Sequence, residues 1–336
     1  MGDISRQTGG TDAWPRKVVS RHNRRWAMST LATASLLSLT AITGCGQGSN
    51  VANTQASANT NGVVRAVAAE DQYASVISQI GGHFVSVKAL MSNPNTDPHT
   101  YEASTADAAL IGGAQLVIQN GLGYDGFMNK LEAASPNPKR KVIDVAQSLG
   151  YSPQTPNPHL WYNPATMART AVLVEQDLAH EDPTHAAYFK QNLQRFEASI
   201  KSLDQAIAAV KRTEANTPVA VTEPVADYLL QAAGMDIKTP WTFQVAVMNG
   251  IDPAPQDVQT EDDLITQHKV KVLVYNLQAV NTATNALLSE ARASHVPVVG
   301  VFETMPPADT YQSWMQSEVR DLSNAIQHGT SAGMVN

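Results

Sequence analysis

A short pattern containing histidine occurs twice in the sequence. Asp97-Pro98-His99-Thr100-Tyr101 and Asn157-Pro158-His159-Leu160-Trp161 each place an Asp or Asn and a proline before the histidine, and an aromatic residue two positions after it. The proline restricts the backbone just before each imidazole, and the aromatic ring can pack beside it, so that a loop presents the histidine rigidly. Histidine is the commonest metal ligand among side chains, and two histidines in matching settings predict a metal site.

Two glutamates stand in comparable positions in the second half of the chain. Glu223 follows the predicted strand 219–221, and Glu303 follows the predicted strand 298–302. Ligands of open α/β sheets bind beyond the carboxyl ends of the strands, which is where both carboxylates should lie. Together with the two histidines they predict a site of two nitrogen and two carboxylate ligands, whose charges would neutralise a divalent ion.

Short apolar strands alternate with amphipathic helices in both halves of the chain. We predict strands at 63–69, 85–90, 116–119, 142–145, 219–221, 270–275 and 298–302. We predict helices at 71–80, at 104–113, from Asn163-Pro164 onward, from Pro224 to near Gly234, and at 261–268, 281–294 and 309–327. This alternation predicts an α/β fold with mainly parallel sheets in two lobes, residues 62–181 and 217–330.

One long apolar stripe between the lobes predicts a single helix over 182–213. Its apolar residues recur at alternating intervals of four and three: Phe189, Leu193, Phe196, Ile200, Leu203, Ile207 and Val210. That spacing is typical of one helix face, and Asp182 and Pro183 suit its first turn as a cap and as a residue whose N–H is not needed. Roughly thirty residues at about 1.5 Å each give a rod of about 45 Å. We interpret 182–216 as a rigid bridge between the lobes. The alternative is a two-stranded coiled coil that forms a homodimer, because the spacing is also heptad-like.

Length, charge and cysteine content narrow the class of protein. A chain of 336 residues with 43% hydrophobic and 16% charged residues predicts two globular domains with sizeable cores. The formal net charge is −7, and the first 45 residues contain six Arg or Lys against two Asp, so the remainder is more acidic still. An acidic protein is a poor candidate for binding nucleic acid. The single cysteine, Cys45, excludes an intrachain disulfide and a cysteine-based zinc site.

The N-terminal segment predicts export. Residues 1–44 combine a basic region with an apolar one and end in small residues, which is typical of a secretory signal peptide. Ile42-Thr43-Gly44-Cys45 resembles a bacterial lipobox, in which the lipidated cysteine becomes the new N-terminus and tethers the protein to a membrane surface. An ordinary cleaved signal and a single membrane anchor are the alternatives. The segment 45–61 is rich in Ser, Asn, Gly, Gln and Ala and predicts a flexible tether.

The chain from about 63 to 326 resembles the TroA-like solute-binding lipoproteins of bacterial zinc and manganese ABC transporters. The resemblance rests on the two histidine motifs, on Asn120-Gly121-Leu122-Gly123 and on Asp182-Pro183 before the long helix. It implies a fold of two lobes bridged by one rigid helix. It also implies a protein, expected to be a monomer without enzymatic activity, that is lipid-anchored on the extracytoplasmic face of the cell membrane. Such a protein delivers metal to an ABC transporter permease and its cytoplasmic ATPase.

The resemblance also implies the ligand set His99, His159, Glu223 and Glu303. Glu303 departs from the usual pattern, in which the fourth ligand is an aspartate. The expected cargo is one divalent ion, Zn²⁺ or Mn²⁺: carboxylate-rich sites suit manganese, whereas intrinsic affinity places manganese below zinc. The alternative function is an exported zinc-dependent hydrolase in which one glutamate serves as the base. A catalytic zinc needs an open position for water, and four protein ligands leave none.

Overall fold

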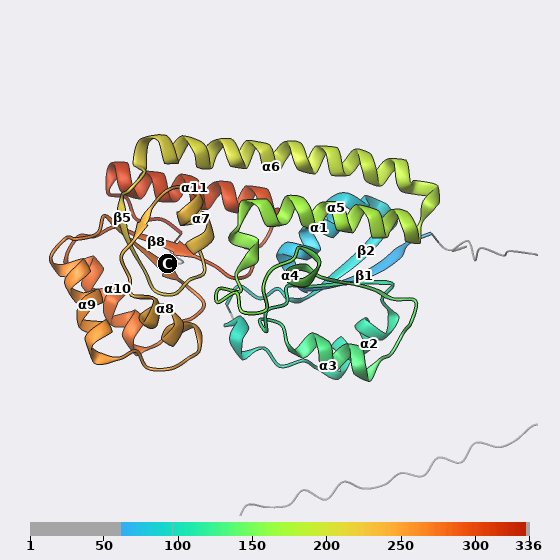
Figure 1. Ribbon diagram of the computed structural model, residues 1–336, viewed down its shortest axis with the longest axis horizontal. Coiled ribbons are helices and arrows are strands. Elements are labelled where there is room, and N and C mark those ends of the chain that lie inside the picture. Colours follow the sequence, from blue (N-terminus) through green and yellow to red (C-terminus); the bar gives the residue numbers. More distant parts are fainter. Residues whose placement is uncertain (1–61, 96, 334–336) are drawn as a thin grey trace, which may run out of the picture. The chain divides into compact units, whose positions relative to one another are not determined.

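The computed structural model describes residues 62–95 and 97–333 (Figure 1). The predicted signal peptide (1–44), the tether (45–61) and the lipidation site Cys45 lie outside the described residues. Within the described part, no helix is both long enough and apolar enough to cross a membrane.

The first half of the chain forms a four-stranded parallel sheet with the strand order β2-β1-β3-β4. Its strands are β1 (Val64–Glu70), β2 (Val85–Met91), β3 (Leu116–Gln119) and β4 (Lys141–Asp144). Its helices are α1 (Asp71–Gly81), α2 (Thr105–Gly113), α3 (Phe127–Ala134), α4 (Val145–Ser148) and α5 (Pro164–Glu181), with short 3₁₀ turns η1 (Gly82–Phe84), η2 (Pro98–Thr100) and η3 (Leu160–Tyr162). We call this part the N-terminal lobe.

The second half repeats the arrangement in a parallel sheet with the order β6-β5-β7-β8. Its strands are β5 (Pro218–Val221), β6 (Asp236–Ile237), β7 (Val272–Asn276) and β8 (Val298–Val301). Its helices are α7 (Asp227–Ala232), α8 (Trp241–Met248), α9 (Pro255–Thr266), α10 (Thr282–Ala293) and α11 (Tyr311–His328). In each sheet the first strand along the chain, β1 or β5, lies between the second and the third strand, so the direction in which strands are added reverses beside it. Ligands of open α/β sheets bind at such a switch point, beyond the carboxyl ends of the strands.

A 29-residue helix, α6 (Ala186–Glu214), connects the lobes and confirms the predicted long helix. At about 1.5 Å per residue it is about 43 Å long. Its start differs from the prediction, because a 3₁₀ turn, η4 (Pro183–His185), precedes it and Asp182 makes no capping hydrogen bond. The Asp182 carboxylate instead lies 2.6 Å from Nδ1 of His185.

The apolar stripe of α6 is covered within the chain itself. Six of its seven predicted residues are buried and Leu193 is half-buried. The stripe packs against α1, α5 and α11, and Figure 1 shows α5 and α11 lying alongside α6. A coiled-coil dimer would need this stripe to be exposed, so the packing argues against that alternative.

Five elements depart from the sequence predictions. The helix predicted from Pro224 begins at Asp227, and the helix predicted at 261–268 begins earlier, at Pro255. The helices α3 and α8 and the two-residue strand β6 were not predicted. The residues of α8 are almost all apolar, so they carry no helical periodicity to detect.

We expect the packing of α6 to dominate the stability of the fold. Replacing the buried Leu203 by alanine should lower the free energy of unfolding by about 2–5 kcal/mol, because it removes apolar contacts and leaves a cavity. Urea unfolding followed by circular dichroism measures this change. The control is Gln205→Ala at an exposed position of the same helix, which should change stability by less than about 0.5 kcal/mol. Equal effects of the two substitutions would contradict the role given to the stripe.

Candidate metal site

Three of the four predicted ligands meet between the lobes. Nε2 of His99 lies 3.4 Å from Oε2 of Glu303, and Nε2 of His159 lies 3.3 Å from the same oxygen. The ligand atoms of these residues all lie within 4.8 Å of one another. Two atoms that each bind zinc at about 2.1 Å in tetrahedral geometry lie roughly 3.4 Å apart, so this spacing fits a metal ion.

The two histidine turns are stabilised by the same type of hydrogen bond, from the backbone N–H of the histidine to an Asx side chain. Oδ1 of Asp97 accepts a hydrogen bond from the backbone N–H of His99 at 2.8 Å, and Oδ1 of Asn157 accepts one from His159 at 3.0 Å. In each turn the intervening proline fixes the backbone between the Asx side chain and the imidazole. The rigid presentation expected from the repeated motif therefore has a specific basis in the Asx hydrogen bond.

The side chain of Asn157 also sets the tautomer of His159. Its Nδ2 donates to the Pro224 carbonyl at 2.7 Å, which fixes the orientation of the amide, and its Oδ1 lies 2.8 Å from Nδ1 of His159. An amide oxygen can only accept, so Nδ1 carries the proton and Nε2 keeps the lone pair that a metal requires. The contact with Pro224 also joins this turn to the C-terminal lobe.

Glu303 is held by partners from both lobes. Tyr124 of the N-terminal lobe donates its hydroxyl to Oε2 at 2.8 Å, and Asn276 at the end of β7 donates Nδ2 to Oε1 at 2.8 Å. The backbone N–H of Glu303 donates to Oε1 of Gln278 at 2.6 Å. The carboxylate is fully buried, so these hydrogen bonds replace the water that it loses.

Glu223 lies beside this group and not within it. Its Oε1 accepts a hydrogen bond from Nδ2 of Asn276, the same nitrogen that donates to Glu303. Its Oε2 is buried and has no hydrogen-bond partner among the described residues. An unsatisfied buried oxygen on a carboxylate that shares Asn276 with Glu303 is a donor available to a cation.

The four groups have different proton affinities. Burial and the charge of Glu303 raise the pKa of Glu223 well above its ordinary value. Burial opposes ionisation of Glu303 as well, but the contacts with His159 and His99 hold its pKa well below the ordinary value. Burial would lower the pKa of His99, yet the contact with Glu303 raises it, whereas for His159 burial prevails and the pKa is lowered.

His99 is the most accessible of the four predicted ligands. A quarter of its side chain is exposed, whereas His159 and Glu303 are fully enclosed. It lines an opening of about 270 Å³ together with Leu122, Gly123, Tyr124, Pro156, Pro158, Met248 and Asn249.

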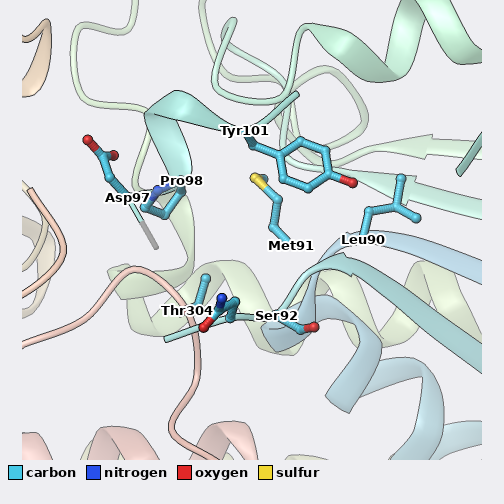
Figure 2. Close-up of a pocket in the computed structure, with 8 residues that line it drawn as sticks. Leu90, Met91, Ser92, Asp97, Pro98, Tyr101 and Thr304 are labelled. Atoms are coloured by element: carbon cyan, nitrogen blue, oxygen red, sulfur yellow. The ribbon is translucent and has the colours of Figure 1, made fainter. Parts of the chain in front are cut away.

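A second pocket, of about 200 Å³, borders the turn that carries His99. Figure 2 shows Asp97, Pro98 and Tyr101 on one side of it and Thr304 and Ser92 on another. The packing around the His99 turn is therefore less complete than the packing around His159.

The residues that form hydrogen bonds to Glu303 are not predicted from the sequence. Asn276 occupies the same kind of position as Glu223 and Glu303, directly at the carboxyl end of a strand, but the predicted strand ended one residue too early to draw attention to it. Tyr124 follows the Asn120–Gly123 motif and was not singled out. Gly121 in that motif has φ +83°, and a side chain there would meet the carboxylate of Asp144, so glycine is required for this turn.

The fold and the site together define a class of protein: a two-lobed α/β protein with a candidate metal site between the lobes and a long helix joining them. A family model described as the zinc-uptake complex component A, periplasmic, matches residues 66–325. The chain belongs to this family, which confirms the resemblance inferred from the motifs.

Curated relatives extend over most of the chain. The manganese-binding lipoprotein MntA of Bacillus subtilis is 23% identical over 321 residues, which cover 88% of this chain and 99% of that protein. The zinc-binding protein TroA of Treponema pallidum is 25% identical over 238 residues, which cover 68% of this chain and 75% of that protein. None of these comparisons supports the alternative of a zinc hydrolase.

The solved structure of the periplasmic zinc-binding protein TroA from Treponema pallidum has the same fold. Its TM-score is 0.67 with 20% identity, and the alignment covers 79% of this chain and 99% of that chain. This likeness confirms the predicted α/β fold in which a long helix bridges two parallel sheets.

We expect both histidines to be required for metal binding. His99→Ala and His159→Ala should each weaken the binding of Zn²⁺ or Mn²⁺ by at least about 100-fold, since each removes one ligand from a site of few ligands. Isothermal titration with each metal measures the effect. The matched control is His180→Ala, an exposed histidine on α5, which should bind as the wild type does. Wild-type affinity in both ligand variants would refute the assignment.

Proposed function

We propose that this protein captures a divalent transition metal between its lobes and delivers it to an ABC transporter permease for uptake. The observation that supports this most strongly is the meeting of His99, His159 and Glu303 at ligand spacing. Glu223 is the fourth ligand, because its free oxygen is buried beside the group.

The cargo is Zn²⁺ or Mn²⁺. Two imidazole nitrogens and two carboxylates suit both ions, and they supply two negative charges to a divalent cation. The relatives point the same way, since MntA is named for manganese and TroA for zinc. The ion is a transported ligand and not a resident cofactor.

The proposed partners follow from family membership and from the leader. The protein acts as a monomer that hands its ion to a membrane permease, and lipidation of Cys45 tethers it to the extracytoplasmic face of the cell membrane. It is not an enzyme, because four protein ligands fill a tetrahedral site and leave no position for a reactive water.

Metal content provides the direct test. The soluble domain from Gly46 onward should contain about one equivalent of metal after loading and dialysis, and binding should raise its unfolding temperature because the ion binds only the folded state. Elemental analysis gives the stoichiometry, and a zinc-versus-manganese competition ranks the ions. A protein that retains no metal under any loading condition would exclude the proposal.

Metal affinity should fall as the pH is lowered. The ion competes with protons for His99 and Glu223, whose pKa values are both raised, so each group takes up its proton at a higher pH than it ordinarily would. Each proton displaced weakens binding by about tenfold per pH unit below the pKa of its group. Titrations from about pH 8 to about pH 5, with circular dichroism to verify the fold, measure the slope. Constant affinity across this range would argue against ligation by these groups.

A further inference from the structure

A buried hydroxyl behind the metal site has more hydrogen-bond contacts than its own proton can supply. Tyr162 lies on η3, three residues after His159, and its hydroxyl oxygen is 2.7 Å from the carbonyl oxygen of Phe302 and 2.9 Å from Oε1 of Glu318. The same Oε1 lies 2.7 Å from the indole nitrogen of Trp314.

The number of available protons shows which group must donate in the remaining hydrogen bond. A phenol has one proton and an indole has one, yet three contacts join these four groups. The Phe302 carbonyl can only accept, so the Tyr162 proton goes to it, and the Trp314 proton goes to Oε1. The remaining contact, between Oε1 and the Tyr162 oxygen, needs a proton on Glu318. A carboxylic O–H can donate to Tyr162 and still accept from Trp314.

The surroundings of Glu318 agree with a neutral acid. The side chain is buried, and none of the ion pairs among the described residues involves it. Burial raises the pKa of its carboxyl group to about 8. An unpaired buried carboxylate is costly, and protonation removes that cost.

This hydrogen-bond network connects the two chain segments that carry His159 and Glu303. Tyr162 belongs to the turn that carries His159, and Phe302 directly precedes Glu303. A second contact ties the same helix to the same turn, because the hydroxyl of Tyr311 donates to the carbonyl of Trp161 at 2.7 Å. Figure 1 shows α11, which carries Glu318 and Tyr311, running beside α6.

We propose that Glu318 is a positioning residue for the metal site: as a protonated acid it completes the Tyr162 network that holds the His159 turn at a fixed distance from Glu303. The inference rests on the proposed function, since its effect is on metal affinity. Residues outside the ligand set commonly change metal affinity by about 10- to 100-fold when they are replaced.

Two substitutions separate a protonated acid from an ionised one. Glu318→Gln cannot donate and accept with the same atom, so it should weaken metal binding by about tenfold, and Glu318→Leu should weaken it at least as much. If Glu318 were ionised, its oxygen would accept from both Tyr162 and Trp314, and an amide oxygen would replace it without loss. Wild-type affinity in Glu318→Gln therefore overturns the inference.

A thermodynamic cycle tests whether the effect runs through Tyr162. Tyr162→Phe should also weaken binding, and adding Glu318→Gln to that background should have no further effect. Additive losses would show that Glu318 does not act through the hydroxyl. The control for general destabilisation is Leu322→Ala, one turn further along the buried face of α11, which should lower the unfolding temperature and leave the metal affinity unchanged.

An infrared measurement tests the proton itself in the metal-free protein. The wild-type spectrum minus the Glu318→Gln spectrum at pH 7 should show the carbonyl stretch of a protonated carboxylic acid; a carboxylate stretch in its place would overturn the inference. This readout keeps the two proposals distinct, because a wild type that binds no metal defeats the proposed function. A wild type that binds metal but lacks the acid band defeats only the role of Glu318.

Discussion

The structure depends on the burial of one ionised carboxylate. Glu303 is fully enclosed and no lysine or arginine forms an ion pair with it within the described residues. Such a charge is tolerated only when it is surrounded by donors, and the chain supplies these from Tyr124 of one lobe and Asn276 of the other. Because the donors come from both lobes, the lobes must meet at this point for either to be satisfied. A cation of charge two is the natural complement to the arrangement.

The connections around the site limit how the lobes can move. Asn157 bonds to Pro224, Tyr228 bonds to the carbonyl of Asn157, and Asp71 accepts from the backbone of Met305, so three separate contacts cross between the lobes. Helices α6 and α11 run together and both pack against α1. Wide hinge bending would break all of these contacts at once, so the architecture suits small local shifts on metal loading.

The sequence located the residues that meet between the lobes better than it located the residues that hold them in place. The Asx-Pro-His turns and the glutamates that follow strands are local features. They can be predicted because the conformation of a turn or a strand end depends mainly on the few residues that form it. Contacts such as Asn276 with Glu303 or Tyr162 with Phe302 depend on how distant segments pack, and no periodicity reports them. The same limit explains Glu223: its place after a strand was predictable, whereas its hydrogen bond to Asn276 was not. The start of α6 was misplaced for a local reason, since Asp182 pairs with His185 and leaves the capping position.

The unequal exposure of the two histidines has a kinetic consequence. An ion surrounded by buried ligands can exchange only through the ligand that solvent or another protein can reach. Among the proposed ligands this is His99, whose turn borders a pocket and which lines the opening. Transfer to an acceptor would then be associative and ordered: an incoming donor group replaces the outer imidazole first, and the inner ligands release the ion only after this exchange. Tight equilibrium binding and rapid handover are compatible under such a sequence, because the ion is never left without partners.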